Sequence, residues 1–364
     1  MSLEAACLRA RQAAAQWFLE SGIQEPSGGV ARYYRTDLQA NYRVSTEITG
    51  YVASTLVWLF RLCGDERLRE AATRAGNFLL LRARDPASGV FPFEYASDGD
   101  SAEPLTYFFD NAIVVRGLTS LWRLTGRQEF LEAAHRCGLA MARLFPAEDG
   151  FRAALVLPGL EPAPADERWS RNPGCYHLKA ALAWLELELA GFVGEFEDAW
   201  RRALEYALAT HARFLPPDAG PAAMDRLHAY LYFLEGLLAC TERADCRRVL
   251  GEGIERVTDL LERIAPAFER GDVRAQLLRV KLYADALGVR KLDEQEAERQ
   301  VQRILDYQAQ EADRRVRGGF RFGRRAGAWM PFVNPYTTAF AVQALEMWRL
   351  RRTGCFQPRW QELI

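Results

Sequence analysis

Five ionisable side chains of this chain have the types and positions that acid–base chemistry requires. They are the acids Glu47, Glu94 and Asp110 and the histidines His177 and His228, and we expect them to be catalytic. Hydrolysis of a glycosidic bond needs two carboxyl groups, one that protonates the leaving oxygen and one that acts on water or on the sugar. Histidine exchanges a proton near neutral pH, so the two histidines suit proton abstraction beside a carbonyl or carboxylate.

Each of the five also has a structural interpretation, which stays open from the sequence. Glu47 follows Ser45 and could support the start of a helix as its capping partner. Asp110 could pair with an arginine, and either candidate histidine could be a hydrogen-bonded residue of the core. The other two histidines, His135 and His211, lie in amphipathic segments and are expected to be structural or exposed.

Cations and aromatic residues near the same segments are expected to bind the substrate. Arg32, Arg226 and Arg274 could hold an acidic group through paired hydrogen bonds. Trp329 could stack on a sugar ring. The full set of expected substrate-binding residues is Arg32, Asn111, Tyr176, Asp225, Arg226, Arg274, Trp329, Asn334 and Tyr336.

The elements that must position these residues are pairs of helices. The segments 45–64 and 106–126 are apolar on nearly all sides, whereas 65–84 and 127–145 are apolar on one face only. A helix that is apolar all round is buried, and an amphipathic one lies on a surface. Each pair therefore predicts an inner helix followed by an outer helix, and the pair recurs about every 50 to 65 residues.

Counting these pairs along the chain predicts the whole fold. Inner helices are predicted at about 45–63, 106–125, 175–190, 225–241, 272–287 and 335–350. Outer helices are predicted at about 66–84, 128–145, 194–214, 246–269 and 293–315, and the N-terminal segment 3–21 supplies the sixth. The count predicts an all-α (α/α)6 barrel, or toroid, which forms a single domain over residues 1–364 with the N-terminal helix closing the ring. Because the inner helices would run parallel, their N-termini would meet at one rim, where we expect the site.

Helix ends and loops carry their own signals. Glycines that tolerate a positive φ stand where inner helices should stop, at Gly64, Gly126, Gly191 and Gly288. Asp65 and Asp293 are expected to start outer helices as N-caps. Glycine turns followed by alternating apolar residues predict short β-hairpin-like loops at one rim, in segments 28–33, 88–94, 149–152 and 318–322.

These features resemble the six-hairpin glycosidase-like superfamily, within the broader group of α/α toroids. The resemblance rests on the alternating helices, the Gly-Gly-apolar turns and the segment 334–339, which opens an inner helix, and it covers nearly the whole chain. It implies a carbohydrate-active enzyme, because members of this superfamily are mostly hydrolases, polysaccharide lyases and sugar epimerases. Motifs of other toroid families are missing, since the sequence has no Asp-Asp pair, and its two close Cys–His pairs, Cys175 with His177 and His135 with Cys137, supply too few ligands for a zinc site. We therefore expect no metal and no cofactor.

Composition narrows the compartment and the partners. A net charge of −1 with 49% hydrophobic residues gives no indication of nucleic-acid binding, and no segment is apolar enough to predict a membrane span. The seven cysteines form no CxxC pair and predict free thiols in a reducing compartment. The N-terminus lacks the order of a signal peptide, and arginine supplies nearly all of the positive charge, which is typical of a GC-rich, bacterial-type genome. We expect a cytoplasmic protein that binds a saccharide or glycan, in an oligomeric state that the sequence leaves open.

The most specific function that the sequence predicts is that of a glycoside hydrolase-like enzyme, acting on a neutral or acidic saccharide at the N-terminal rim of the inner helices. Two alternatives stay open. One is a polysaccharide lyase or sugar epimerase that uses His/Tyr proton transfer. The other is a non-catalytic toroid that binds a glycan or a protein in polysaccharide biosynthesis.

Overall fold

The computed structural model describes residues 2–95, 104–216, 220 and 223–364, and twelve α-helices lie within them. These residues divide into two compact units, each of which is described by itself. The first unit holds Met1–Ile23, Tyr33–Asn41 and Ala212–Ile364, and the second holds Gln24–Arg32 and Tyr42–His211. The single domain expected over residues 1–364 stays a prediction.

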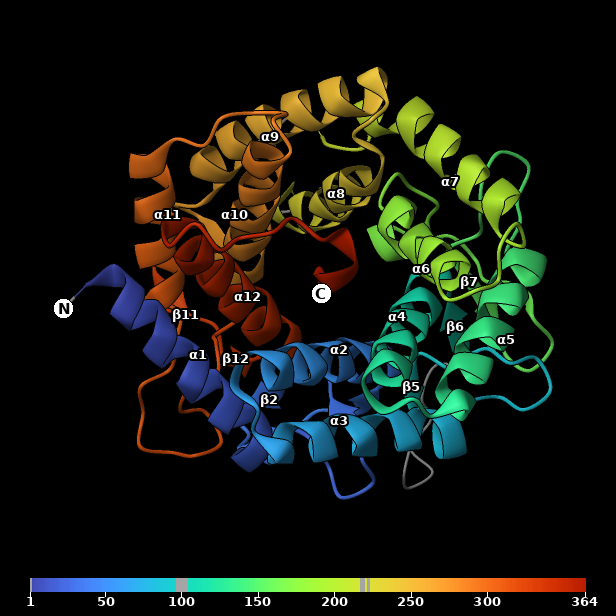
Figure 1. Ribbon diagram of the computed structural model, residues 1–364, viewed down its shortest axis with the longest axis horizontal. Helices are drawn as coiled ribbons and strands as arrows, with labels where there is room; N and C mark the ends of the chain where they lie inside the picture. The colour runs from blue at the N-terminus through green and yellow to red at the C-terminus, as the bar shows by residue number, and fades with distance from the viewer. Residues whose placement is uncertain (1, 96–103, 217–219, 221–222) are drawn as a thin grey trace. The chain divides into compact units, whose positions relative to one another are not determined.

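The second unit consists of a buried layer of three helices and a covering layer of three more. The buried layer consists of α2 (Thr46–Cys63), α4 (Phe108–Thr125) and α6 (His177–Leu189). The covering layer consists of α3 (Glu66–Phe78), α5 (Gln128–Leu144) and α7 (Glu197–Thr210). In Figure 1, α4 packs against both α2 and α6, and each buried helix packs against the covering helix that follows it. The alternation of inner and outer helices is therefore confirmed in this unit.

Two glycines allow α2 and α4 to approach each other closely. A Cβ atom on Gly50 would lie 2.8 Å from the carbonyl oxygen of Ile113, and one on Gly117 would lie 2.7 Å from the carbonyl oxygen of Gly50. Any side chain at either position would push the helices apart, so only glycine permits this contact. The contact brings the first turns of α2 and α4 together, and these turns carry Glu47 and Asp110.

The first unit repeats the same two-layer arrangement. Its buried layer consists of α8 (Ala223–Leu237), α10 (Gly271–Ala286) and α12 (Pro335–Arg352). Its covering layer consists of α9 (Ala244–Ile264), α11 (Glu294–Leu305) and α1 (Leu3–Glu20). Within this unit α10 packs against α8 and α12, and α1 packs against α12 and α11. The N-terminal helix thus lies beside the last inner helix, as the sequence predicted.

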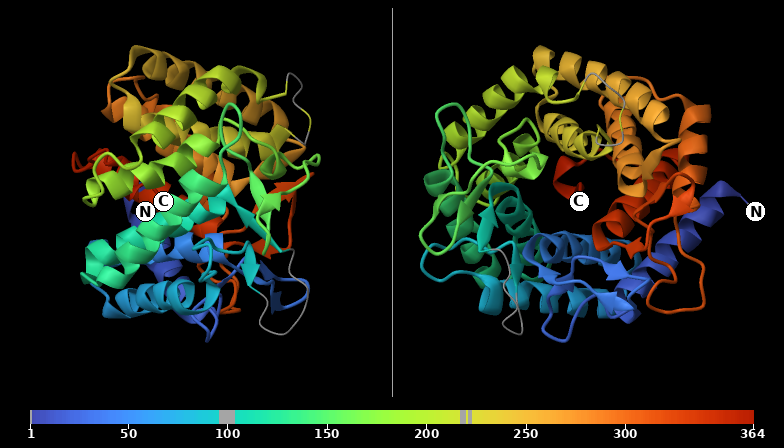
Figure 2. Two further views of the ribbon diagram at one scale, coloured as in Figure 1. Left: turned by 90° about the vertical axis from the view of Figure 1, so that its right-hand side faces the viewer. Right: turned by 180° about the vertical axis from the view of Figure 1, so that it is seen from behind.

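Short antiparallel strands form in the connections between helices, and of the four predicted glycine-turn segments 28–33 and 88–94 contain strand residues, whereas 149–152 and 318–322 contain only isolated bridges. In the second unit β1 (Val30–Ala31), β4 (Val44–Ser45) and β5 (Glu94–Tyr95) form one sheet, and β6 (Leu105–Tyr107), β7 (Ala154–Val156) and β8 (Glu161–Pro162) form another. In the first unit the sheets are β9 (Phe268–Arg270), β10 (Gly323–Arg325) and β11 (Ala328–Trp329), and β12 (Phe332–Val333), β2 (Tyr34–Arg35) and β3 (Ala40–Asn41). Since β4, β6, β9 and β12 lead into buried helices, the strands gather at the N-terminal ends of those helices (Figure 2).

The predicted helix ends are mostly confirmed. Gly64 and Gly126 end α2 and α4 with a φ of +69° each, in the left-handed region. The side chains of Asp65 and Asp293 accept hydrogen bonds from backbone N–H groups in the first turns of α3 and α11. These residues satisfy groups that a helix end leaves without a partner inside the helix.

Two predicted outer helices were too long. The helix expected over 293–315 ends at Leu305, because Gln308 leaves the helix to pair with Phe320 and to bond through its side chain to Ala10 and Gly318. The helix expected over 246–269 ends at Ile264, since Phe268–Arg270 forms the strand β9. The helix expected over 66–84 is confirmed to Ala83, since the α-helix that reaches Phe78 continues as a π-helical turn, Leu79–Ala83.

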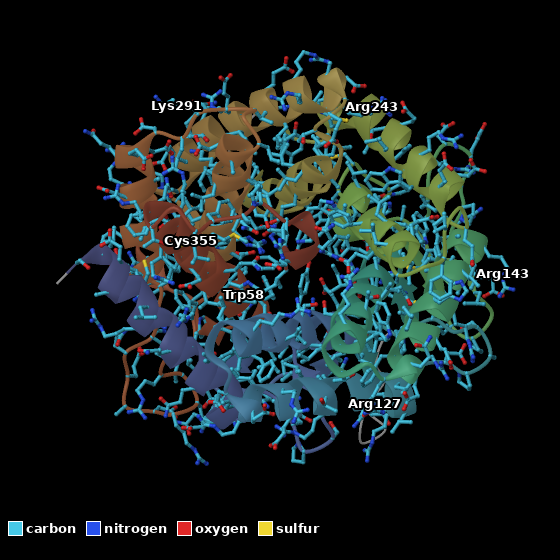
Figure 3. The ribbon with its side chains drawn as sticks, viewed as in Figure 1. Trp58, Arg127, Arg143, Arg243, Lys291 and Cys355 are labelled. Carbon is cyan, nitrogen blue, oxygen red and sulfur yellow. The ribbon has the colours of Figure 1, made fainter. Side chains whose placement is uncertain are left out.

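Side chains follow the division into buried and covering layers. Trp58 on the buried helix α2 is 9% exposed, whereas Arg127 and Arg143 at the two ends of α5 project from the covering layer (Figure 3). Among the described helices, none combines the length and apolar character that crossing a membrane requires.

Candidate active site

Glu47 and Asp110 form a pair of interacting carboxyl groups in the second unit. Each lies in the first turn of a buried helix, Glu47 in α2 and Asp110 in α4. The two differ in access, because Asp110 is 6% exposed whereas Glu47 is half-buried. Within the described residues, the Oδ2 atom of Asp110 has no hydrogen-bond partner. The pair therefore combines a buried, unpartnered acid with a neighbour that a ligand can reach.

The surroundings favour the protonated form of both acids. Burial raises the pKa of Asp110 well above its usual range, and the negative charge of Glu47 raises it further. Burial also raises the pKa of Glu47, to about 7, although the charges of Arg32 and Lys179 act in the opposite direction. Two like charges at close range cannot both form easily, so the pair holds a proton near neutral pH.

Glu94 belongs to this site, but as an anchor for cations. Its Oε1 atom accepts a hydrogen bond from Nη1 of Arg32 at 3.1 Å, and its Oε2 atom accepts one from Nη1 of Arg43 at 3.3 Å. Arg32 also lies over the ring of Phe93, with its guanidinium carbon 4.7 Å from the ring centroid. Glu94 is 5% exposed, so its charge serves to hold the two arginines near the acid pair.

Lys179 adds a second positive charge that sequence reasoning missed as a site residue. It is fully buried in α6, and its ammonium nitrogen lies 5.7 Å from the ring centroid of Tyr51, one turn after Glu47 in α2. Its charge lowers the pKa of Glu47. The available signal was its rarity, since the chain has only three lysines and this one falls in an apolar helix.

His177 is a buried aromatic residue of the second unit whose ring packs against other aromatic side chains. Its ring lies 4.8 Å from that of Phe108 and 4.4 Å from that of Tyr176, centroid to centroid. Neither ring nitrogen has a partner among the described residues, and burial lowers the pKa of the ring to about 3. The side chain stays neutral at physiological pH, and the geometry supports packing in place of the expected proton transfer.

Asn111 and Tyr176 also serve the local structure. The Oδ1 atom of Asn111 accepts a hydrogen bond from the backbone of Phe91 at 2.8 Å, and its Nδ2 atom donates to Thr106 and to the backbone of Tyr107. The hydroxyl of Tyr176 donates to the carbonyl of Asn172 at 2.8 Å. Both side chains are buried and committed to loop backbone, so we withdraw their assignment to substrate binding.

A second cluster lies in the first unit, around His228. The Nδ1 atom of His228 in α8 lies 2.9 Å from Oδ2 of Asp272 and 2.7 Å from Oε1 of Gln276, both in α10. Asp272 in turn accepts two hydrogen bonds from Arg270, at 3.0 and 2.6 Å. Since Nδ1 faces two acceptors, it carries the hydrogen, which leaves Nε2 as the basic nitrogen. The ring of Tyr336 in α12 lies 6.0 Å from the imidazole, centroid to centroid.

Charges around His228 keep Asp272 ionised. Burial alone would raise the pKa of Asp272, but the charge of Arg270 and the hydrogen bonds from Arg270 and His228 hold it well below its usual range. Burial and the charge of Arg270 lower the pKa of His228, against the opposing effect of Asp272 and Gln276. At neutral pH the imidazole is therefore neutral and suited to accept a proton at Nε2.

Asp272 and Arg270 were missed from the sequence, although a signal was present. Asp272 lies in the first turn of a buried helix, which is the pattern that singled out Glu47 and Asp110. Asp225, an expected ligand for substrate, instead accepts a hydrogen bond from Nη1 of Arg270 at 2.6 Å.

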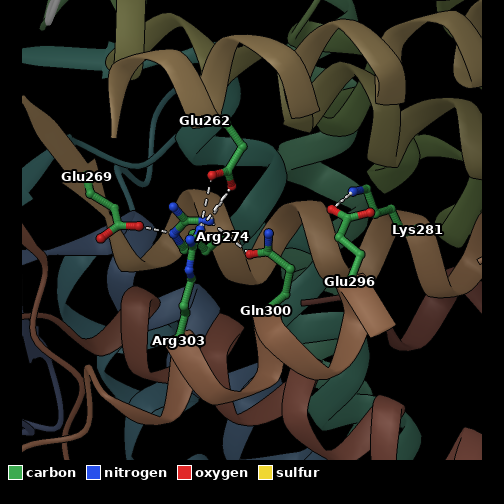
Figure 4. Close-up of polar contacts among 7 residues, drawn as sticks. All are labelled: Glu262, Glu269, Arg274, Lys281, Glu296, Gln300 and Arg303. Atoms are coloured by element: carbon green, nitrogen blue, oxygen red, sulfur yellow. Dashed lines mark hydrogen bonds and ion pairs between the residues drawn. The ribbon is translucent and has the colours of Figure 1, made fainter. Parts of the chain in front are cut away.

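Arg274 does not reach a site, because charged and polar neighbours surround it. It is 1% exposed, and Figure 4 shows its guanidinium bonded to Glu269, Glu262 and Gln300. All of these partners come from the first unit, where Glu262 lies in α9, Glu269 in β9 and Gln300 in α11. The arginine therefore holds α10 to these three elements. This corrects the expectation that it binds substrate.

The remaining residues that were expected to bind substrate lie in the first unit and differ in their exposure and contacts. Arg226 lies over the ring of Phe214 at 5.3 Å. Asn334 is the N-terminal cap position of α12 and is 4% exposed, and its Oδ1 atom has no partner within the described part of the chain. Trp329 is 37% exposed and lies under the guanidinium of Arg324, 3.8 Å from the ring centroid. In the part of the chain that the structure describes, no three His, Cys, Asp or Glu side chains are grouped as metal ligands would be.

Comparison with known proteins places the chain by its fold. No protein-family model matches the sequence, and no curated protein matches it either. Solved structures do match over nearly the full length. A sugar epimerase from a ruminal bacterium shares 14% identity at a TM-score of 0.72, covering 95% of this chain and 99% of that chain. Cellobiose 2-epimerase from Spirochaeta thermophila shares 16% identity at a TM-score of 0.70, covering 97% and 99%.

An unsaturated glucuronyl hydrolase from Bacillus sp. GL1 is similar to the same degree, with 14% identity and a TM-score of 0.67 over 96% of this chain and 98% of that chain. These similarities confirm the expected fold class, an all-α (α/α)6 fold with small β-hairpins. The proteins with this fold that match here process carbohydrates by different reactions. The reaction of this chain must therefore be argued from its own side chains.

Proposed function

We propose that this protein is a carbohydrate-active enzyme that hydrolyses a glycosidic bond through Asp110 and Glu47. The observation that carries the proposal is the placement of Glu47 and Asp110 in the first turns of two closely packed helices, where burial raises the pKa of both carboxyl groups. A general acid must be protonated at working pH, and burial beside a second carboxylate keeps Asp110 in that form.

Each side chain then has a role in the reaction. Asp110 donates its proton to the leaving oxygen of the saccharide, and Glu47, the more accessible member, acts as a carboxylate on water or on the sugar. Arg32 and Lys179 stabilise the ionised form of Glu47. Glu94 orients Arg32, so it is a positioning residue.

A hydrolysis assay with matched variants tests this proposal. Purified protein is incubated with a panel of neutral and uronate-containing disaccharides, and released monosaccharide is measured. Asp110→Asn and Glu47→Gln, which keep the size of each side chain, should each lower kcat by about 100-fold or more while the circular dichroism spectrum is unchanged. If either variant kept full activity on a disaccharide that the wild-type protein hydrolyses, the assignment of Asp110 and Glu47 as catalytic residues would be overturned.

Sugar epimerisation is a second candidate, and the His228–Asp272 dyad favours it. A neutral imidazole whose Nδ1–H points at a carboxylate can remove a proton beside a carbonyl with Nε2. The reactions differ in a measurable way. Epimerisation in D2O incorporates deuterium at the carbon that inverts and releases no monosaccharide, whereas hydrolysis releases monosaccharide without deuterium on carbon. Proton NMR of the products distinguishes them.

A cytoplasmic location belongs to this proposal as well. All seven cysteines are free thiols, and five of them are buried, which suits a reducing compartment. Detection of the native protein in a cytosolic fraction, without disulfides by thiol titration, is the expected result.

A further inference from the structure

Two arginines and a tryptophan form an unassigned cluster on the β9–β10–β11 sheet of the first unit. Arg324 and Trp329 are directly opposite each other across β10 and β11, so their side chains share one face of the sheet. The guanidinium carbon of Arg324 lies 3.8 Å from the centroid of the Trp329 ring, and that of Arg321 lies 5.3 Å from it. Both cations therefore contact the same ring.

The hairpin that carries this cluster has a tight turn. The two residues between β10 and β11, Ala326 and Gly327, have φ values of +47° and +79°. Positive φ at both central residues is the feature of the type I′ turn, whose twist matches that of a two-stranded hairpin. The turn fixes the register that places Arg324 opposite Trp329.

Arg324 lacks a carboxylate partner. No ion pair joins it to an acid among the described residues, and its Nε atom is buried without a hydrogen-bond acceptor there. The acid opposite it on β9 is Glu269, which is engaged by Arg274 (Figure 4). A buried N–H donor without an acceptor is costly, so this guanidinium has unused capacity for an anion.

Positive charge accumulates around this donor. Burial and then the charge of Arg324 lower the pKa of Arg321, which shows that the two guanidinium groups repel each other. Arg325 follows directly, with its guanidinium 4.9 Å from the ring centroid of Phe268. The acid that pairs with Arg321 is Glu311. Arg325 lies on the opposite face, so Arg321 and Arg324 with one glutamate leave an excess of positive charge on this face, which an oxyanion would neutralise.

We propose that Arg321, Arg324 and Trp329 form a subsite for the carboxylate of an acidic saccharide. The inference rests on the proposed function, because it takes the ligand to be a saccharide. A carboxylate beside Arg324 accepts charge-assisted hydrogen bonds from its guanidinium, and Trp329 holds that guanidinium in place by the cation–π contact. Arg321 supplies the second cation, and Glu311 competes with the ligand for it.

Calorimetric titration of the full chain with sodium D-glucuronate, D-glucose and sodium sulfate tests the subsite without requiring turnover. Glucuronate should bind at least about tenfold more tightly than either glucose or sulfate. Equal affinity for glucose would overturn the proposal, because the carboxylate would then contribute nothing. Equal affinity for sulfate would overturn it as well, since the site would then bind a free oxyanion and no sugar.

Matched variants separate the subsite from general damage to the hairpin. Arg324→Gln should weaken glucuronate binding by about tenfold or more, whereas Arg325→Gln, its exposed neighbour, should change it less than about twofold. Glu311→Gln should strengthen binding, because it removes the competing carboxylate, and a damaged fold would not do so. Unchanged affinity in Arg324→Gln sinks the subsite while leaving hydrolysis by Asp110 and Glu47 intact. Failure of the hydrolysis assay leaves these binding results unaffected.

Discussion

The Nδ1 atom of His228 lies 2.9 Å from Oδ2 of Asp272, and Asp272 accepts two hydrogen bonds from Arg270. A single carboxylate in the first turn of α10 thus fixes the orientation of the imidazole and balances a buried cation. Because both partners are buried, removal of the carboxylate affects the orientation of the imidazole and the stability of the fold together.

Asp272→Asn should destabilise the protein by about 3–5 kcal/mol at pH 7, because it leaves the buried charge of Arg270 poorly compensated. The pKa of Asp272 is lowered in the folded state, so its stabilisation is present above the unfolded pKa, about 4, and is lost as the pH falls through the folded value. Urea unfolding at pH 7 and pH 3 measures this. The gap between wild type and variant should narrow at pH 3, and a constant gap would contradict the ion-pair interpretation.

Glu47→Gln should make the protein more stable at high pH. The pKa of Glu47 in the folded state is raised to about 7, so its protonated form contributes stability that is lost as the pH rises through about 7. Glutamine cannot ionise, and the variant should exceed wild type by about 1–3 kcal/mol at pH 8.5 and differ little at pH 5. Thermal melts at the two pH values supply the comparison. A variant that is equally or less stable than wild type at pH 8.5 would contradict the raised pKa of Glu47 in the folded state.

Lys179→Met should move the pH optimum of the reaction upward. Removing the buried ammonium group removes a charge that lowers the pKa of Glu47, so this carboxyl group ionises at higher pH. The pH dependence of kcat/KM measures the shift. Lys281→Met is the matched control, because Lys281 is another mostly buried lysine and pairs with Glu296 at 2.5 Å (Figure 4). The control should lose stability while keeping the wild-type pH profile.

His177→Leu should leave kcat within about twofold of wild type and should not lower the melting temperature. Both ring nitrogens are buried without partners among the described residues, so an apolar replacement removes two unsatisfied polar atoms. Saturation kinetics and a thermal melt of the same preparation supply the comparison. A loss of kcat above about 100-fold with an unchanged melting temperature would return His177 to the catalytic residues.

The sequence predicted most of the helices because burial and helical period are local properties. Apolar runs mark α2 and α4, and Gly64 and Gly126 mark their ends. The acid pair could also be predicted, since a carboxyl group at the start of an apolar helix stands out without any knowledge of its partners. The boundary of α11 could not, because the pairing of Gln308 with Phe320 involves residues that are far from the helix in sequence.

The outcome of the remaining site predictions depended on hydrogen-bond and ion-pair partners that the sequence does not reveal. Arg274 looks like a free cation in the sequence, but Glu262 and Glu269 neutralise it through contacts that no local pattern reveals. His177 is the first residue of α6 and His228 is the sixth residue of α8, and of the two only His228 lies next to a carboxylate among the described residues. Sequence alone distinguishes residue types at a helix start and leaves their neighbours undetermined.

The contact between Gly50 and Gly117 makes the distance between two carboxyl groups depend on two residues that have no side chains. Mutation at either glycine would alter the acidity of Asp110 without touching any ionisable atom, because separated helices weaken the repulsion between the charges. Selection on the chemistry of this protein would therefore act on its backbone spacing. Glycine at positions 50 and 117 is a marker by which distant relatives with the same acid pair can be sought.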